Sequence, residues 1–167
     1  MSAPLLTVGG LAVGLAITGV NLWHWWKSPG RDPKNLAPFG GAFVLGGLST
    51  LCGGLLGVLA GWTAGANNAA GKHAVTSVAG GRTGTVVHKA AGQLTPGGAL
   101  ATFLIAVGVF VAWRAANKQL KRRLAGGWWA GATLTLSAGM AGLFVNVVSL
   151  VNNLGGGVLG WFNGGAA

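Results

Sequence analysis

The stretch Leu36–Gly65, LAPFGGAFVLGGLSTLCGGLLGVLAGWTAG, is apolar and contains no charged residue. A helix needs about 20 apolar residues to cross the hydrocarbon core of a bilayer, and this stretch is longer than that. Inside lipid the backbone amides have no water to bind, so the segment is expected to be helical in spite of its glycines. The sequence therefore predicts a membrane-spanning helix over residues 36–65.

Glycines recur at regular intervals along this predicted span. One row has a period of four residues, the GxxxG spacing of a glycine zipper, and another has a period of seven. The first row is Gly53, Gly57, Gly61 and Gly65, and the second is Gly40, Gly47, Gly54 and Gly61. On a helix, such rows form smooth ridges where a second backbone can approach closely. We expect these glycines to mediate helix packing and oligomerisation.

The whole chain has the composition of a membrane protein. Of its 167 residues, 51% are hydrophobic, 7% are charged and 33 are glycine, whereas about a quarter of a soluble domain is charged. The chain has eleven Lys and Arg residues and a single acid, Asp32, so its formal net charge is +10. The single cysteine, Cys52, cannot form an intramolecular disulfide and is predicted to be a small packing residue.

Three further stretches, residues 5–26, 97–113 and 124–150, are apolar enough to be membrane spans. No basic residue precedes Lys27, so we expect the first stretch to be retained as a span and not removed as a signal peptide. The predicted fold class is therefore all-α. We expect one membrane domain, residues 1–167, whose four transmembrane helices form two helical hairpins.

The segments outside the predicted spans are polar or rich in glycine. Residues 66–98 are predicted to form an extracytoplasmic loop, in which Ala74–Val78 and Thr85–Lys89 flank a GGRTG turn and indicate a short β-hairpin. Residues 154–167 are expected to lie at the membrane interface. We recognise no residue-level repeat between the two hairpins, so their similarity is expected to be one of topology.

Basic residues gather in the two short turns that close the hairpins, 27–35 and 114–123. They are Lys27, Arg31, Lys34, Arg114, Lys118, Lys121, Arg122 and Arg123. By the positive-inside rule these turns face the cytoplasm, and both termini lie outside. Tryptophans are expected to anchor the interfaces, with Trp23, Trp25, Trp26, Trp113, Trp128 and Trp129 on the inner side and Trp62 and Trp161 on the outer side.

The positive charge of these turns indicates an anionic partner. Near an anionic leaflet each basic residue is worth about 1 kcal/mol, so lipid headgroups are the expected partner. The alternative partner is the phosphate backbone of DNA. No base-reading motif accompanies the charges, so such DNA contact would be independent of sequence.

The sequence offers no catalytic machinery. Glutamate is absent and Asp32 is the only acid, which excludes catalysis by paired carboxylates. His73 and His88 lack the short spacing of metal ligands. The segment Gly65–His73 resembles a phosphate-binding loop, but its first glycine comes one residue too early and His73 replaces the hydroxyl residue. We therefore expect a non-enzymatic protein without catalytic residues, metal or cofactor.

A small polytopic chain rich in Ala, Gly, Val and Leu, with short basic cytoplasmic turns, resembles two groups of proteins from mobile elements. They are the multi-span spread proteins of actinobacterial conjugative plasmids, which are thought to help DNA pass between cells, and phage membrane proteins, including holins. A looser similarity to type IV secretion pilin subunits rests on the turn KSPGRDPKN between two apolar segments.

The resemblance implies a structural or pore-forming component of a DNA-transfer apparatus in a bacterial cell membrane. One alternative is a phage holin or a virion membrane protein that opens a path for DNA. Another alternative, from a different class, is an ion or small-solute channel. We expect the chain to act as a homo-oligomer or as a subunit of a larger membrane assembly.

Overall fold

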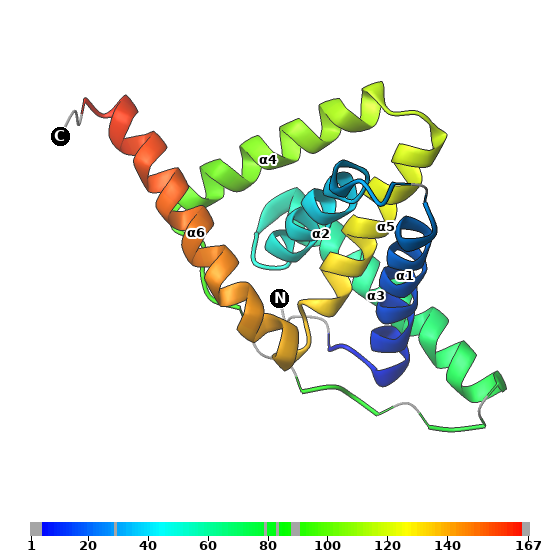
Figure 1. Cartoon of the computed structure of the whole chain (residues 1–167). Coiled ribbons are helices and arrows are strands. Elements are labelled where there is room, and N and C mark those ends of the chain that lie inside the picture. The colour runs from blue at the N-terminus through cyan, green and yellow to red at the C-terminus, as the bar shows by residue number, and fades with distance from the viewer. Residues whose placement is uncertain (1–4, 29, 79, 83, 88–90, 165–167) are drawn as a thin grey trace.

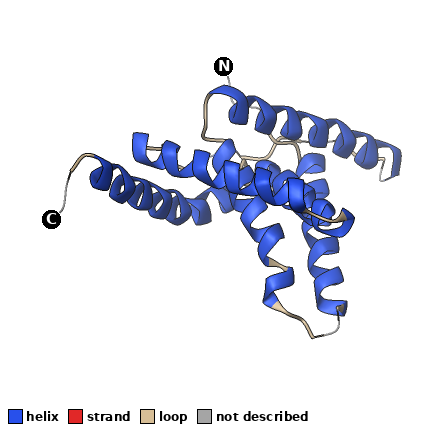
Figure 2. Ribbon diagram, turned by 90° about the horizontal axis from the view of Figure 1, so that it is seen from above, coloured by secondary structure: helices blue, strands red, loops and turns tan. Residues whose placement is uncertain are grey.

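The computed structural model describes residues 5–28, 30–78, 80–82, 84–87 and 91–164, and this part of the chain is helical (Figure 1). Its elements are α1 (Val8–Lys27), the 3-10 helix η1 (Pro33–Asn35), α2 (Ala37–Ser49), α3 (Gly54–Val78), α4 (Pro96–Ala115), α5 (Lys118–Leu134) and α6 (Ala138–Phe162). Within the described residues, helices and loops make up the ribbon (Figure 2). The predicted all-α fold class is confirmed.

Two of these helices, α4 and α6, are long and apolar enough to cross a membrane. A third crossing is available if α2 and α3, which meet at a bend of 103°, act together as one broken span or re-entrant segment. The described part of the chain thus contains two to three segments that could span a bilayer. This number is compatible with the predicted membrane location.

The structure corrects the predicted spans 36–65 and 124–150, because each is interrupted by a break between two helices. The first break separates α2 from α3, and the second separates α5 from α6. The basic segment 114–123 is also not a simple continuation of α4, because Asn117 caps a new helix, α5, at this point. The continuous hydropathy of each predicted span therefore hides a turn of the backbone.

Hydroxyl groups satisfy the carbonyls at both breaks. Thr50 Oγ1 donates a hydrogen bond to the carbonyl of Gly47 at 2.7 Å, and Thr135 Oγ1 donates to that of Gly131 at 2.7 Å. The same carbonyls also accept the backbone N–H of Thr50 at 3.2 Å and of Thr135 at 3.3 Å, so each hydroxyl adds a second hydrogen bond in the last turn of its helix. Hydroxyl bonds of the same kind occur inside intact helices, at Thr63 and Thr102, so they accompany the two breaks and do not by themselves cause them.

The predicted β-hairpin in the 66–98 loop is not formed. Residues 74–78 belong to the end of α3, and Thr85 instead forms an isolated antiparallel bridge with Thr7. Part of the second predicted strand, residues 88–90, lies outside the described residues. The predicted interfacial tail from residue 154 is also helical, because α6 continues to Phe162. The last three residues of that tail, 165–167, lie outside the described residues.

The helices form two repeats of three, so that α1, α2 and α3 recur as α4, α5 and α6. Helices α1 and α4 each have 20 residues, and α3 and α6 each have 25. The same pattern starts both repeats, LTVGG at residues 6–10 and LTPGG at residues 94–98. The expectation that the two halves share no residue-level repeat was wrong.

In the first repeat, Thr7 joins α1 to α3. Its Oγ1 caps α1 by accepting a hydrogen bond from Gly10 N–H at 3.0 Å. Its own N–H and hydroxyl donate to Asn68 Oδ1 at 2.9 and 3.0 Å, and Asn68 Nδ2 donates to the carbonyl of Leu5 at 2.7 Å. One asparagine on α3 therefore fixes the start of α1.

The second repeat reproduces this arrangement bond for bond. Thr95 Oγ1 accepts from Gly98 N–H at 3.1 Å and so caps α4. The N–H and hydroxyl of Thr95 donate to Asn152 Oδ1 at 3.0 and 3.2 Å, and Asn152 Nδ2 donates to the carbonyl of Gln93 at 3.1 Å. The two repeats thus share their contacts as well as their order of helices.

Glycines bring the helix backbones together beside each of these caps. Gly9 of α1 contacts the backbone of Gly71 of α3, and Gly97 of α4 contacts that of Gly155 of α6. A Cβ at any of these positions would overlap the partner backbone. Small residues are what allow such close approach between helices in a membrane.

Helices α2 and α5 pack against each other at the centre of the molecule and relate the two repeats (Figure 1). Gly46 faces the backbone of Trp128, and Gly131 faces the backbone of Phe43. Gly46 and Gly131 hold corresponding positions in the repeats, as do Phe43 and Trp128. Each helix therefore uses the same pair of positions to contact the other, as two helices related by a twofold axis would. Helices α2 and α5 run in the same direction.

Candidate functional site

In the part of the chain that the structure describes, no group of three or more His, Cys, Asp or Glu residues could hold a metal ion. The carboxylate of Asp32 accepts a hydrogen bond from the backbone N–H of Lys34 at 2.9 Å and caps η1. The features that could recognise a ligand are two basic turns at one end of the molecule and an apolar groove beside one of them.

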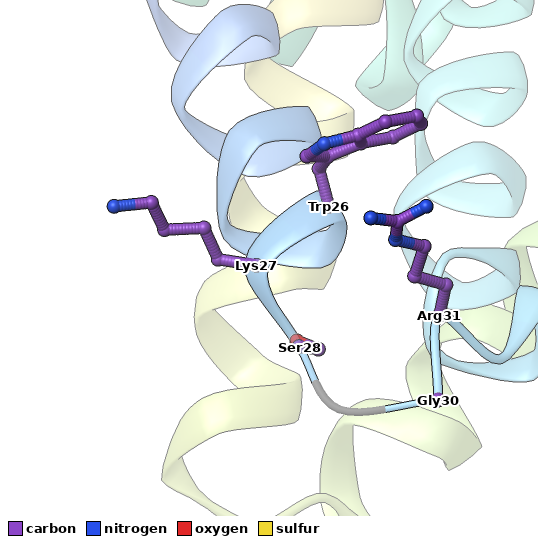
Figure 3. Close-up of a pocket in the computed structure, with 5 residues that line it drawn as sticks. All are labelled: Trp26, Lys27, Ser28, Gly30 and Arg31. Atoms are coloured by element: carbon purple, nitrogen blue, oxygen red, sulfur yellow. The ribbon is translucent and has the colours of Figure 1, made fainter.

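The first basic turn holds its cations against tryptophan rings. Lys27 Nζ lies 4.3 Å from the ring centroid of Trp23, and the Arg31 guanidinium lies 4.2 Å from that of Trp26. Figure 3 shows Arg31 directed toward the Trp26 ring and Lys27 directed to the other side of the turn. A shallow cavity of about 710 Å³ is lined by Trp26, Lys27, Ser28, Gly30 and Arg31. These cations already have partners in cation–π contacts.

The second basic turn presents a pocket of about 420 Å³ lined by Trp113, Lys118, Lys121, Arg122 and Ala125. Arg114 lies in the last turn of α4. Arg123 is directed elsewhere, because its Nη1 donates a hydrogen bond to the carbonyl of Asn35 at 2.5 Å. This bond joins the two basic turns, so the structure brings all the predicted cations to the same end of the molecule (Figure 1).

An open apolar groove of about 1070 Å³ lies between α3, α4 and α5. Its walls include Leu59 and Trp62 of α3, Phe110 of α4 and Trp128 of α5. Trp113 and Ala125 line both this groove and the pocket of the second basic turn. The groove therefore leads from the apolar body of the molecule to a cluster of cations.

The predicted glycine ridge lies mostly on an unpacked face of α3. A Cβ added at Gly53, Gly61 or Gly65 would meet no atom within 4 Å. At Gly57 it would meet the carbonyl of Cys52 in the same chain. The two remaining predicted glycines differ from the ridge. Gly54 starts α3 with a φ of +63°, and Gly47 packs against the ring of Phe144.

The predicted tryptophan anchors fall into two groups. Trp23, Trp26, Trp62 and Trp161 are more than half exposed, and Trp113 is exposed at the end of α4. Three others use the indole N–H inside the chain: Trp25 donates to the carbonyl of Asp32 at 3.0 Å, Trp128 to Thr63 Oγ1 at 3.4 Å, and Trp129 to Asn67 Oδ1 at 2.5 Å. The side chains of the exposed group lie on the surface of the chain, whereas those of the second group bond within it.

Polar side chains that were not predicted from the sequence hold the helices together. Asn67 is buried and donates through Nδ2 to Thr133 Oγ1 at 2.6 Å, which joins α3 to α5. Asn68 and Asn152 hold the first helix of each repeat. The recurring LT-x-GG pattern was the available signal for the last two, since it marks the two threonines that they contact.

Comparison with known proteins gives no match at the level of family, curated protein or fold. No family model, no curated protein and no solved structure matches the chain.

Proposed function

We propose that this chain is a non-enzymatic integral membrane protein and serves as a structural subunit of a membrane assembly. The observation that carries the proposal is the apolar exterior of the chain. Phe103, Phe110, Leu143 and Leu150 on α4 and α6 are each more than half exposed. Buried side-chain nitrogen and oxygen atoms of the described residues, by contrast, all have hydrogen-bond partners. Such a surface is stable in lipid and unfavourable in water.

The proposed topology has four membrane segments. They are the candidate crossings α4, α6 and the bent pair α2–α3, together with α1 as a fourth segment, with the basic turns in the cytoplasm and both termini outside. Irregular backbone is tolerated at membrane depth only where protein or a water-filled cavity surrounds it. Ser49 and Thr135 at the two breaks are buried within the chain, which supports placing both breaks inside the membrane domain.

Cysteine labelling on intact cells tests this topology. In a Cys52→Ser background, Val87→Cys should react with a membrane-impermeant maleimide, and Ser28→Cys should react only after the cells are opened. The reverse pattern would overturn the proposed orientation. A chain that stays monomeric and soluble without detergent would overturn the membrane function itself.

The unpacked part of the Gly53–Gly65 ridge supports assembly with other copies. In lipid, close helix association depends on such smooth surfaces, and this one has no partner within the described chain. Gly61→Leu and Gly65→Leu should lower the oligomer fraction measured by light scattering in detergent. Gly108→Leu is the matched control, because Gly108 is also free of neighbours but stands outside the ridge. An unchanged fraction in the ridge variants would refute the role.

The assembly that we propose is a DNA-transfer apparatus of a bacterial cell membrane. Its support is the resemblance to spread proteins, together with a cation cluster at one end that could contact phosphates without reading sequence. Binding of duplex DNA to the solubilised chain should weaken with salt, with a log–log slope of about −0.9 for each phosphate contact. Absence of DNA binding, or abrupt depolarisation of expressing cells as a holin or channel would cause, would overturn this role.

A further inference from the structure

We propose that the apolar groove and the second basic pocket form one binding site for an anionic glycerophospholipid. The acyl chains would lie in the groove between α3, α4 and α5, and the headgroup phosphate would lie at Lys118, Lys121 and Arg122. The inference rests on the proposed membrane location. It goes further by naming a ligand and the place where it binds.

The apolar groove and the second basic pocket are continuous. Trp113 and Ala125 line both, so a molecule that fills the groove reaches the cations without leaving the surface. The groove holds about 1070 Å³ and the basic pocket about 420 Å³. Ligand sites generally occupy about 300–1,000 Å³. The groove alone reaches the upper end of this range and the two cavities together exceed it, so the combined site has room for a large amphiphile with an apolar body and an anionic head.

The charge of the second basic turn also favours an anionic ligand. Residues 114–123 carry five cations and no acid, and the single acid of the chain, Asp32, lies in the other turn. Arg123 is bonded to the carbonyl of Asn35, which leaves the three pocket cations to meet a ligand. Basic pockets between helices on the cytoplasmic side bind anionic headgroups, because phosphate oxygens accept strong charge-assisted hydrogen bonds.

The two repeats differ in how their first helices pack. Helix α1 lies close to α5, where a Cβ at Gly126 would come within 2.9 Å of Asn21 Nδ2. The corresponding glycine on α2, Gly41, has no atom within 4 Å of its Cβ position, because α4 diverges there. Val109, the counterpart of Asn21, lines the groove instead. The groove therefore exists because α4 diverges from α2, whereas α1 packs against α5 at the corresponding place.

The first basic turn supplies a matched control. It also carries three cations, Lys27, Arg31 and Lys34, but two of them lie over tryptophan rings. Its cavity is lined by Trp26 near the end of α1 and by residues of the turn, and it shares no lining residue with the apolar groove. Removing charge from this turn therefore tests general attraction to an anionic surface, and removing it from the second turn tests the site.

The test is quenching of tryptophan fluorescence by brominated phospholipids added to the full chain in detergent, since Trp113 and Trp128 line the groove. Brominated phosphatidylglycerol should quench at lower lipid fractions than brominated phosphatidylcholine. Each basic residue near an anionic surface contributes about 1 kcal/mol, or about fivefold, so the triple variant Lys118→Gln, Lys121→Gln, Arg122→Gln should weaken phosphatidylglycerol binding about a hundredfold. The triple variant Lys27→Gln, Arg31→Gln, Lys34→Gln should leave it within about fivefold.

A second variant tests the groove without changing charge. Ala125→Phe places a ring at the junction of the two cavities, at an exposed position that requires no repacking of the core. It should reduce the preference for phosphatidylglycerol by at least tenfold while helical circular dichroism is unchanged. Full binding by this variant would overturn the proposal.

The outcomes separate the site from the membrane location. Equal quenching by both lipids, or equal loss in both triple variants, overturns the anionic-lipid site and leaves the membrane function standing. Absence of quenching by either lipid overturns the membrane function as well. Quenching that disappears whenever the chain is oligomeric would show that a second copy fills the groove, and this result also overturns the proposal. If the triple variant of the second turn fails to fold, Arg122→Gln alone should still weaken phosphatidylglycerol binding about fivefold, and unchanged binding would refute the site.

Discussion

Replacing Asn68 or Asn152 by alanine tests whether the repeated polar contact stabilises the fold. Each asparagine accepts two hydrogen bonds from a threonine, Thr7 or Thr95, and donates a third to a backbone carbonyl. A typical intramolecular hydrogen bond contributes about 0.5–1.5 kcal/mol, and helix-to-helix bonds in membranes average about 0.6 kcal/mol. Three bonds lost together should therefore lower the free energy of unfolding by about 2–3 kcal/mol.

The assay is unfolding of the chain by sodium dodecyl sulfate in mixed micelles, followed by circular dichroism. Asn153→Ala is the control, because Asn153 is exposed and adjacent to Asn152. Surface substitutions of this kind usually change stability by less than about 0.5 kcal/mol. Because the two contacts have the same geometry, Asn68→Ala and Asn152→Ala should cost similar amounts. Costs no larger than that of the control would refute the stabilising role of both contacts.

Four further substitutions, one of them a control, test the packing of the helices in the same assay. Gly71→Val and Gly155→Val would each force a side chain into a partner backbone, and each should cost at least about 3 kcal/mol or prevent folding. Gly157→Val, whose Cβ meets open space, should cost no more than about 1 kcal/mol, and an equal loss at all three positions would contradict the argument. Thr133→Val removes the acceptor for Asn67 Nδ2 in a buried site and should cost about 1–3 kcal/mol; a loss below about 0.5 kcal/mol would show that this bond is dispensable.

The helical nature of the chain could be predicted from its sequence, because long apolar stretches with few charges leave few other structures in lipid. The helix breaks could not. Helices α2 and α5 end after Ser49 and Leu134 within stretches that remain apolar, and hydroxyl residues such as Thr50 and Thr135 also occur inside unbroken helices, so hydropathy does not mark the breaks. The extension of α3 through residues 66–78 was missed because this part is polar. It is held as a helix by Asn67 and Asn68, which bond to α5 and to the start of α1.

The glycine spacing predicted that helices pack closely together, but it did not predict which glycines make the contacts. The regular ridge on α3 has little packed against it within the described chain, whereas less regular glycines, such as Gly46 and Gly131, lie directly against the backbone of another helix. Spacing identifies which glycines share a helix face, but the partner is set by residues far away in sequence. The basic turns show the same limit. Their charges could be read from the sequence, but the groove that opens beside Lys118 and Arg122 could not.

The two repeats agree at some positions and differ at others, and the difference supports the proposed lipid site. Positions that recur, such as Thr7 with Thr95 and Gly9 with Gly97, lie where helices touch and where a larger side chain would overlap a backbone. Packing alone accounts for these positions. The repeats differ where the chain faces outward: in the charge of the basic turns and in the packing of α1 against the splay of α4. Because packing does not require this asymmetry, the open groove and its cations are the part of the structure that calls for a ligand.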